Sequence, residues 1–270
     1  VENPAVKSIL SGSRPRVAIL REQGVNGQIE MAAAFDRAGF SSVDVTMSDL
    51  AEGRRDLMEF AGFAACGGFS FGDVLGAGQG WAKSILYQPR LRDMFELFLG
   101  HPERFALGVC NGCQMLAALK ELIPGAEHWP SFDKNESEQY EARQVMVEVL
   151  ESDSILLTGM EGSHLPIVVA HGEGRAIFES NIQLKYLADN SQTGLRYVDN
   201  RDQPTLVYPY NPNGSTAGIA GLTAANGTVT IMMPHPERVF RTFCNSWHPA
   251  HWGEHSPWLR LFQNARAFAA

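Results

Sequence analysis

The stretch Phe105-Ala-Leu-Gly-Val-Cys110-Asn-Gly-Cys-Gln114 decides the fold. A short apolar run leads directly into Cys110, and leucines at helical spacing follow. We therefore predict a strand over residues 105–109 and a helix over residues 110–123. The glycines two positions before and after Cys110 favour a tight strand-to-helix turn, the arrangement that lifts a nucleophile out of the edge of a sheet.

A thiol in this position has a chemical reason to be reactive. The sulfur of Cys110 is expected at a helix N-terminus, where the dipole and the free N–H groups favour an anion. An ordinary thiol, with a pKa near 8.5, is only a few per cent thiolate at neutral pH. The alternative is that Cys110 is a small buried core residue, as most free cysteines are.

A nucleophilic cysteine needs a base, and Met233-Pro-His-Pro-Glu-Arg238 supplies a candidate. Met233 and His235 each precede a proline, which biases both toward an extended backbone. Residues two apart in an extended chain point to the same side, so His235 and Glu237 are expected to share a face. We predict that Glu237 orients His235 as the base for Cys110. A polar loop with no catalytic role is the alternative.

Working outward, apolar runs alternate with helix-period segments over the first half of the chain. Strands are expected over residues 16–20, 43–46, 63–66 and 105–109, and helices over 27–39, 91–98 and 110–123. Alternating strands and helices imply a parallel sheet covered on both faces, so the predicted fold class is α/β.

The second half is richer in strand-like segments. Strands are expected over residues 144–150, 165–170, 206–210 and 228–233. Asn226-Gly227 lies between apolar segments and predicts a hairpin turn. Ser256 and Pro257 supply a cap and a first-turn proline for a last amphipathic helix.

Composition excludes several classes of protein. The chain has 270 residues, of which 44% are hydrophobic, enough for a full core. The net charge of −8 argues against a nucleic-acid scaffold or a polybasic membrane binder. No apolar run approaches the roughly 18 residues of a membrane span. Four cysteines are too few for a disulfide-built module, which favours a reducing, cytoplasmic setting.

The motifs together resemble a known family. The Cys110 stretch with Pro234-His-Pro-Glu237 resembles the class I (triad) glutamine amidotransferases. The segments Gly67-Gly-Phe-Ser-Phe-Gly-Asp73 with the following residues 76–84, Ala170-His-Gly-Glu-Gly-Arg175 and Asn211-Pro-Asn-Gly-Ser215 resemble more closely the glutaminase domains of phosphoribosylformylglycinamidine synthases. The resemblance covers roughly residues 16–270 and implies a three-layer, flavodoxin-like fold. That fold has a mostly parallel central sheet, helices on both faces and an added β-rich second half.

The resemblance implies a role for each site residue. Cys110 would attack the side-chain amide of glutamine, His235 would carry the proton, and Glu237 would hold the imidazole. The backbone N–H groups that stabilise the oxyanion would come from Gly67, Gly68 and Asn111. The residues implied for substrate binding are Gln114, Phe71, His171 and Gly172.

The resemblance also implies partners. Ammonia would pass, along an ammonia channel, to a synthetase domain of the same longer chain or of a partner subunit. That synthetase is a C–N ligase that uses ATP and Mg²⁺ to convert formylglycinamide ribotide (FGAR) to formylglycinamidine ribotide (FGAM) in purine biosynthesis. This domain itself would bind no cofactor, metal, nucleic acid or membrane. Because the chain starts at Val1, we expect residues 1–15 to be a linker from an upstream synthetase region and residues 16–270 to be the glutaminase domain.

Other hypotheses remain open at this stage. Cys110 and Cys113 form a C-x-x-C pair, which is typical of dithiol oxidoreductases. A cysteine peptidase or esterase, another class I amidotransferase, and a binding module with an idle triad are further alternatives. The loop with His248, His251 and His255 matches no zinc hydrolase signature, so we expect it to pack on its own domain or on a partner.

Overall fold

The structure is a computed structural model that describes residues 3–6 and 12–269. The predicted linker therefore lies partly outside the described residues. Within them, every helix is too short or too polar to traverse a bilayer.

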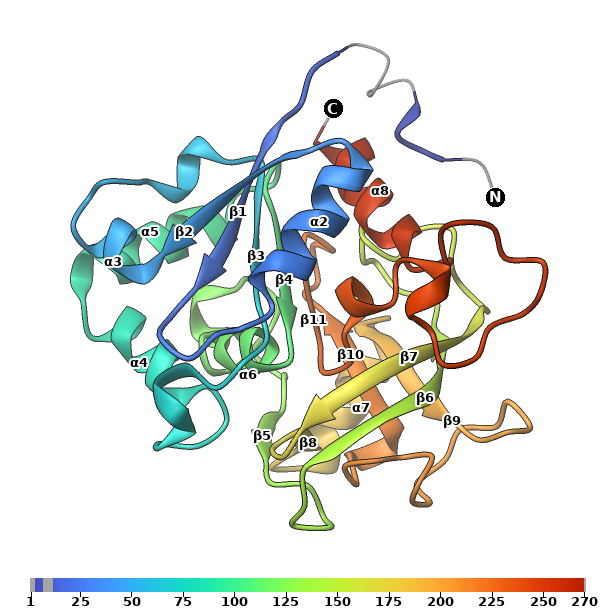
Figure 1. The fold of residues 1–270 in the computed structure, drawn as a ribbon. Coiled ribbons are helices and arrows are strands. Elements are labelled where there is room, and N and C mark those ends of the chain that lie inside the picture. The colour runs from blue at the N-terminus through green and yellow to red at the C-terminus, as the bar shows by residue number, and fades with distance from the viewer. Residues whose placement is uncertain (1–2, 7–11, 270) are drawn as a thin grey trace.

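Strands and helices alternate through the first half of the described chain (Figure 1). The strands are β1 (Arg16–Arg21), β2 (Ser41–Thr46), β3 (Gly62–Ala65), β4 (Phe105–Val109), β5 (Ser131–Asp133), β6 (Glu141–Val149), β7 (His164–His171), β8 (Arg175–Ile177), β9 (Thr193–Val198), β10 (Ile219–Thr223) and β11 (Val229–Met232). The α-helices are α2 (Gln28–Ala38), α3 (Met47–Ala51), α4 (Gln79–Leu86), α5 (Pro89–Leu99), α6 (Asn111–Ala118), α7 (Asn181–Asp189) and α8 (Leu259–Phe268). The short 3₁₀ turns are η1 (Leu57–Glu59), η2 (Ser70–Asp73), η3 (Lys120–Leu122), η4 (Thr216–Gly218), η5 (Pro236–Arg238) and η6 (Thr242–Cys244).

One large sheet carries the architecture. Among the described residues its order is β2-β1-β3-β4-β11-β10-β9-β6-β7, and β5 pairs with β8 in a separate small sheet. The pairs from β2 to β11 are parallel, and those from β11 to β7 are antiparallel. Only β10 and β6 therefore run against the direction of the others in this sheet. The predicted α/β class, with its β-rich second half, is confirmed.

Helices cover both faces of the parallel half (Figure 1). On one face, the ring of Phe35 in α2 contacts Phe105 in β4 at 6.0 Å and Phe262 in α8 at 5.1 Å between centroids. On the other face, Phe63 in β3 contacts Phe95 in α5 at 5.7 Å. The sheet lies between two buried aromatic layers, which gives three layers in all.

Some predicted elements are wrong or incomplete. Residues 206–210 form no strand: Leu206 and Val207 are exposed, and Pro209 within the run lacks the N–H donor that a strand ladder needs, as does Pro204 just before it. The strands β9 and β10 were not predicted. The helix expected over residues 110–123 ends at Ala118 and continues only as the turn η3.

Sheet direction brings distant segments to one edge. Because β3, β4, β11 and β7 run the same way, the residues that follow them gather at their carboxyl ends. The antiparallel half of the sheet also contacts this edge, because Val168 of β7 forms an isolated β-bridge with His235. Four segments that are far apart in sequence thus meet in one place.

Candidate active site

Cys110 occupies a strained turn between β4 and α6. Its φ of 52° and ψ of −109° lie in a region that non-glycine residues rarely adopt. The turn is tight because a Cβ at Gly108 would lie 2.7 Å from the Gly112 carbonyl oxygen. A Cβ at Gly112 would lie 2.0 Å from the carbonyl oxygen of Ala65. The predicted strand–turn–helix is therefore present, and only glycine fits at either flank.

His235 and Glu237 form a buried pair after β11. The distance between His235 Nδ1 and Glu237 Oε1 is 2.6 Å, and each residue is 1% exposed. The His235 N–H donates to the Val168 carbonyl at 2.9 Å, which fixes the segment against β7. The backbone is not extended through Glu237 as expected: the turn η5 begins at Pro236 and brings Glu237 back toward the imidazole.

The structure brings Cys110 and His235 together on either side of Gly67. A Cβ at Gly67 would lie 2.7 Å from His235 Cε1 and 3.3 Å from Cys110 Cβ. Burial opposes the charged imidazolium, but the Glu237 carboxylate and the Cys110 sulfur outweigh it and raise the pKa of His235 to about 9. This arrangement favours an imidazolium at His235, facing the sulfur of Cys110.

The second cysteine of the C-x-x-C pair lies in a different environment. Cys113 is 1% exposed, and burial together with the charge of Cys110 raises the pKa of its thiol well above the ordinary value. A thiol that stays protonated is a poor partner for thiol–disulfide exchange. The environment of Cys113 therefore disfavours the dithiol hypothesis.

The resemblance assigns the oxyanion donors to the backbone N–H groups of Gly67, Gly68 and Asn111. Among the described residues, neither Gly67 N–H nor Gly68 N–H donates a hydrogen bond to another backbone group. Gly68 has a φ of +144° and pairs with Val25, an arrangement in which a Cβ would lie 2.5 Å from Val25 Cα. Asn111 begins α6, so its N–H has no acceptor within the helix.

The side chain of Asn111 has a role that the sequence did not predict. Its Oδ1 accepts from the Ser70 N–H at 3.0 Å. Its Nδ2 donates to Asp73 Oδ1 and to Gln114 Oε1, both at 3.0 Å. One buried amide thus ties the segment after β3 to the first turn of α6. An asparagine directly after Cys110 was the available signal.

A cavity of about 200 Å³ opens at Cys110. Its lining residues are Gly68, Phe69, Gly72, Asp73, Cys110, Gln114, Tyr140, His171, Gly172 and Glu173. The cavity brings together the predicted Gln114, His171 and Gly172. Phe71 is not among its lining residues and packs near Gly80 instead.

Two carboxylates and a tyrosine in this cavity were missed. Burial raises the pKa of Asp73 above its ordinary value, while Asn111 opposes that rise. The Glu173 carboxylate accepts a hydrogen bond from the Ala77 N–H. Tyr140 packs against Phe69 with ring centroids 6.2 Å apart. For Asp73 and Glu173, the available signal was an acidic residue inside a segment that resembles the family.

His171 is neutral in this site. Burial, and then the charge of His235, lower its pKa to about 3. Its Nε2 lies 3.0 Å from Asn213 Nδ2, an amide donor, so the ring proton belongs on Nδ1. His171 therefore cannot compete with His235 as a base. Asn213 lies in the 211–215 segment, so this hydrogen bond connects that segment to His171.

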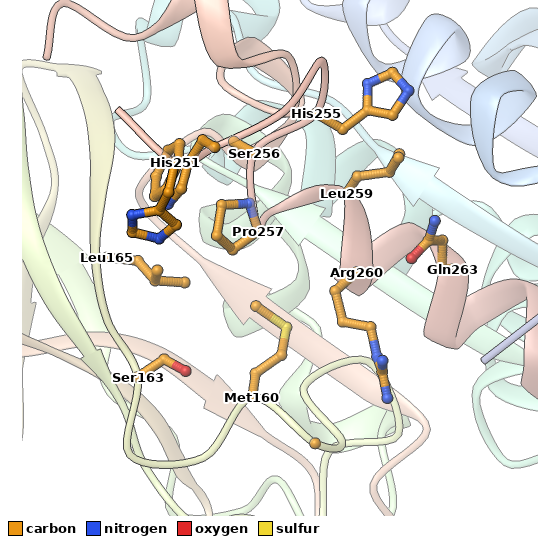
Figure 2. A pocket seen from close by; sticks show the side chains of 12 residues that line it. Met160, Ser163, Leu165, His251, His255, Ser256, Pro257, Leu259, Arg260 and Gln263 are labelled. Carbon is orange, nitrogen blue, oxygen red and sulfur yellow. The ribbon is translucent and has the colours of Figure 1, made fainter. Parts of the chain in front are cut away.

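The histidine-rich loop lies elsewhere. No group of three metal-ligating side chains occurs within the described part of the chain. His255 Nε2 accepts from Arg37, and the ring of His248 stacks on Trp252. His251 lines a separate cavity of about 430 Å³, where Figure 2 shows it near Leu165. None of Cys110, His235 and Glu237 lines that cavity.

The fold and site together define an α/β protein with a cysteine at a strand-to-helix turn beside a buried histidine–carboxylate pair. The family model of the CobB/CobQ-like glutamine amidotransferase domain matches residues 14–269, and the chain therefore belongs to that family. A chain of PurLQS from Thermotoga maritima shares the fold with a TM-score of 0.70 and 24% identity, over 94% of this chain and 98% of that one. A protein from Thermoplasma acidophilum, assigned as a GMP synthase subunit, has a TM-score of 0.57 and 13% identity, over 95% and 94% of the two chains.

Proposed function

We propose that the chain is the glutaminase part of a phosphoribosylformylglycinamidine synthase. The observation that carries the proposal is the meeting of Cys110, His235 and Glu237 in a glutamine amidotransferase domain. The synthase-like segments support the particular enzyme, because residues 67–73, 170–175 and 211–215 all contribute to the cavity at Cys110 or to its immediate support.

The first half of the reaction forms a thioester. The Cys110 thiol gives its proton to His235, and the sulfur attacks the side-chain amide carbon of glutamine. The oxygen of the tetrahedral intermediate is negative, and we assign its stabilisation to the N–H groups of Gly67, Gly68 and Asn111. The imidazolium of His235 then gives its proton to the departing nitrogen. Ammonia leaves, and a γ-glutamyl thioester remains.

The second half consumes water. His235 takes a proton from a water molecule, whose oxygen attacks the thioester carbon. The C–S bond breaks, glutamate leaves, and the Cys110 thiol is restored with the proton that His235 returns. Glu237 holds the imidazole throughout and stabilises its charge.

Substrate recognition follows from the charges in the cavity. Asp73 and Glu173 line the cavity of about 200 Å³, and their carboxylates suit the α-ammonium group of glutamine. Gln114, Gly172 and the Nδ1–H of His171 offer neutral hydrogen bonds to the remaining polar groups. We assign ATP, Mg²⁺ and the conversion of FGAR to FGAM to the synthetase part, following the resemblance.

Glutamine hydrolysis by the chain with and without its synthetase part tests this function. We expect glutamate formation that depends on Cys110, and covalent labelling of Cys110 by a glutamine-like diazoketone. Cys110→Ser should abolish both. Turnover of peptides or esters without glutamine dependence would overturn the proposal in favour of a peptidase or esterase. Glutamine hydrolysis with amination of a different acceptor would favour another class I amidotransferase.

A further inference from the structure

Glu237 is a buried carboxylate of which only one oxygen is hydrogen-bonded. Its Oε1 lies 2.6 Å from His235 Nδ1, whereas its Oε2 accepts no hydrogen bond from any residue that the structure describes. The side chain is 0% exposed, so water screens its charge little. A carboxylate in such a place is costly unless a cation compensates it. In the proposed reaction His235 is that cation for only part of the cycle, because it gives its proton to the departing nitrogen.

Arg238 supplies a second positive charge. Its Nε lies 3.9 Å from Glu237 Oε1 and 4.0 Å from Glu30 Oε1. That Nε is itself buried and, within the described part of the chain, donates no hydrogen bond. The guanidinium therefore lies within ion-pair distance of two carboxylates and is hydrogen-bonded to neither through Nε. Unlike an imidazolium, a guanidinium keeps its charge throughout the neutral pH range.

The local fold places Arg238 between the two carboxylates. In the turn η5 the Arg238 N–H donates to the His235 carbonyl at 3.4 Å, so Arg238 stays close to the buried pair. Helix α2 packs against η5 and carries Glu30 in its first turn. Gly27, which directly precedes α2, lies against Glu237, since a Cβ there would be 3.8 Å from Oε1. Two elements that are far apart in sequence thus bring their carboxylates to one guanidinium.

We propose that Arg238 is a positioning residue for the glutaminase reaction, and that it compensates the charge of the Glu237 carboxylate while the imidazole of His235 is neutral. Glu30 competes for the same guanidinium and so sets how much of its charge acts on Glu237. The proposal rests on the glutaminase function proposed above. Arg238 is not among the residues that line the cavity at Cys110, so it acts through Glu237 and not on glutamine.

Nearby titratable groups do not replace this charge. Those that interact with Glu30, His235, Glu237 or Arg238 are Cys66, Cys110, Tyr140 and His171. Cysteine and tyrosine side chains are either neutral or negative. Burial, and then the charge of His235, lower the pKa of His171 to about 3, so its ring carries no charge near neutral pH. Arg238 is therefore a fixed positive charge at 3.9 Å from Glu237 that these groups do not duplicate.

Loss of the Arg238 charge has an effect of known sign. The acidic limb of kcat/KM against pH reports uptake of a proton by Cys110, His235 and Glu237 together. Arg238→Gln removes a positive charge beside them, so proton uptake becomes easier and the limb moves to higher pH. Glu30→Gln removes a negative charge, so the limb moves to lower pH. A merely structural role for Arg238 would instead lower kcat/KM by the same factor at every pH.

The test measures glutamate formation against pH for this chain assembled with its synthetase. We expect Arg238→Gln to shift the acidic limb upward by at least about 0.5 pH unit, which is about a threefold loss of kcat/KM on that limb, with the plateau within about twofold. Arg238→Lys keeps the charge and should leave the limb within about 0.2 pH unit of its original position. Glu30→Gln should shift it downward by less than Arg238→Gln shifts it upward, because the Glu30 side chain is 43% exposed.

A matched control uses the other end of α2. Arg37 lies in the last turn of that helix and pairs with the exposed Glu254, so Arg37→Gln breaks an ion pair of α2 and should leave the limb unchanged. An unshifted limb in Arg238→Gln, or a loss that is equal at every pH, overturns the role of Arg238. Where Arg238→Gln does not fold, an unshifted limb in Glu30→Gln overturns it. Absence of Cys110-dependent glutamine hydrolysis in the unsubstituted complex instead overturns the proposed function, so the two failures are distinct.

Discussion

Replacement of Glu237 by glutamine tests the electrostatic basis of the site. Glu237 contacts His235 at 2.6 Å, and both side chains are fully buried. Glutamine keeps the size of the side chain and an acceptor oxygen for His235 Nδ1–H, so Glu237→Gln removes the charge and leaves the hydrogen bond. The substitution therefore isolates the contribution of the carboxylate.

The expected loss follows from the pKa of His235. The rise from 6.5 to about 9 corresponds to roughly 3 kcal/mol in favour of the imidazolium, at about 1.4 kcal/mol per pKa unit. Burial opposes this rise, and Glu237 is the largest contribution in its favour. Since the imidazolium of His235 must protonate the departing nitrogen, we expect Glu237→Gln to lower kcat/KM for glutamine by about 10²-fold. Steady-state glutaminase kinetics with quantified labelling of Cys110 measures it.

Stability against pH gives an independent measurement. The folded-state pKa of His235, about 9, lies above the unfolded value of 6.5. The pair therefore contributes stability that is fully present below pH 6.5 and is lost as pH rises through about 9. The difference in unfolding free energy between the native chain and Glu237→Gln should shrink over that window. A loss in kcat/KM of less than about fivefold, with a pH-independent stability difference, would refute the electrostatic argument.

Three further predictions concern neighbouring residues. Gly67→Ala places a Cβ 2.7 Å from His235 Cε1, so glutaminase kcat should fall at least about 10²-fold with little change in the melting temperature. Asn111→Ala removes hydrogen bonds to the segment after β3 and should lower the unfolding free energy by about 1–3 kcal/mol in chemical denaturation, with a raised KM. Cys113→Ser should keep glutaminase activity within about twofold, whereas Cys110→Ser should abolish it, and equal losses would revive the dithiol hypothesis.

The first half of the fold was predictable because its local signals agree with one another. The run at 105–109 is apolar throughout and corresponds to β4 residue for residue, and the helical periodicity over 27–39 corresponds to α2. Buried parallel strands need continuous apolar runs, and helices that cover them need one apolar stripe. Both patterns can be recognised within a short stretch of sequence, without knowledge of the rest of the chain.

The second half was less predictable because its strands depend on tertiary contacts. β10 has the sequence Ile-Ala-Gly-Leu-Thr, in which alanine and glycine give little strand propensity, yet every residue of it is buried between β9 and β11. The run at 206–210 has the opposite character, with strong strand propensity but a proline within it and another just before it. Strand propensity therefore gave the wrong prediction in both places, because the presence or absence of a neighbouring strand decides whether a segment forms a strand.

The site was predicted in its residue types but not in its assembly. Cys110, His235 and Glu237 were identified from local motifs, whereas Asp73, Tyr140 and Glu173 required the cavity to be seen. No local pattern states that a segment before residue 75 lies next to one after residue 170. Such proximity is a property of strand order, which sequence spacing does not encode.

Strand order also explains why His235 reaches Cys110. β11 inserts directly beside β4, so the chain that leaves β11 passes over the turn that carries Cys110. His235 is then fixed from the other side by Val168 of β7, which joins the antiparallel half of the sheet to the catalytic edge. The β-rich second half is therefore more than a cover for the core. It supplies both the strand that leads into His235 and the strand that holds it, and the Cys110 turn alone could not form this site.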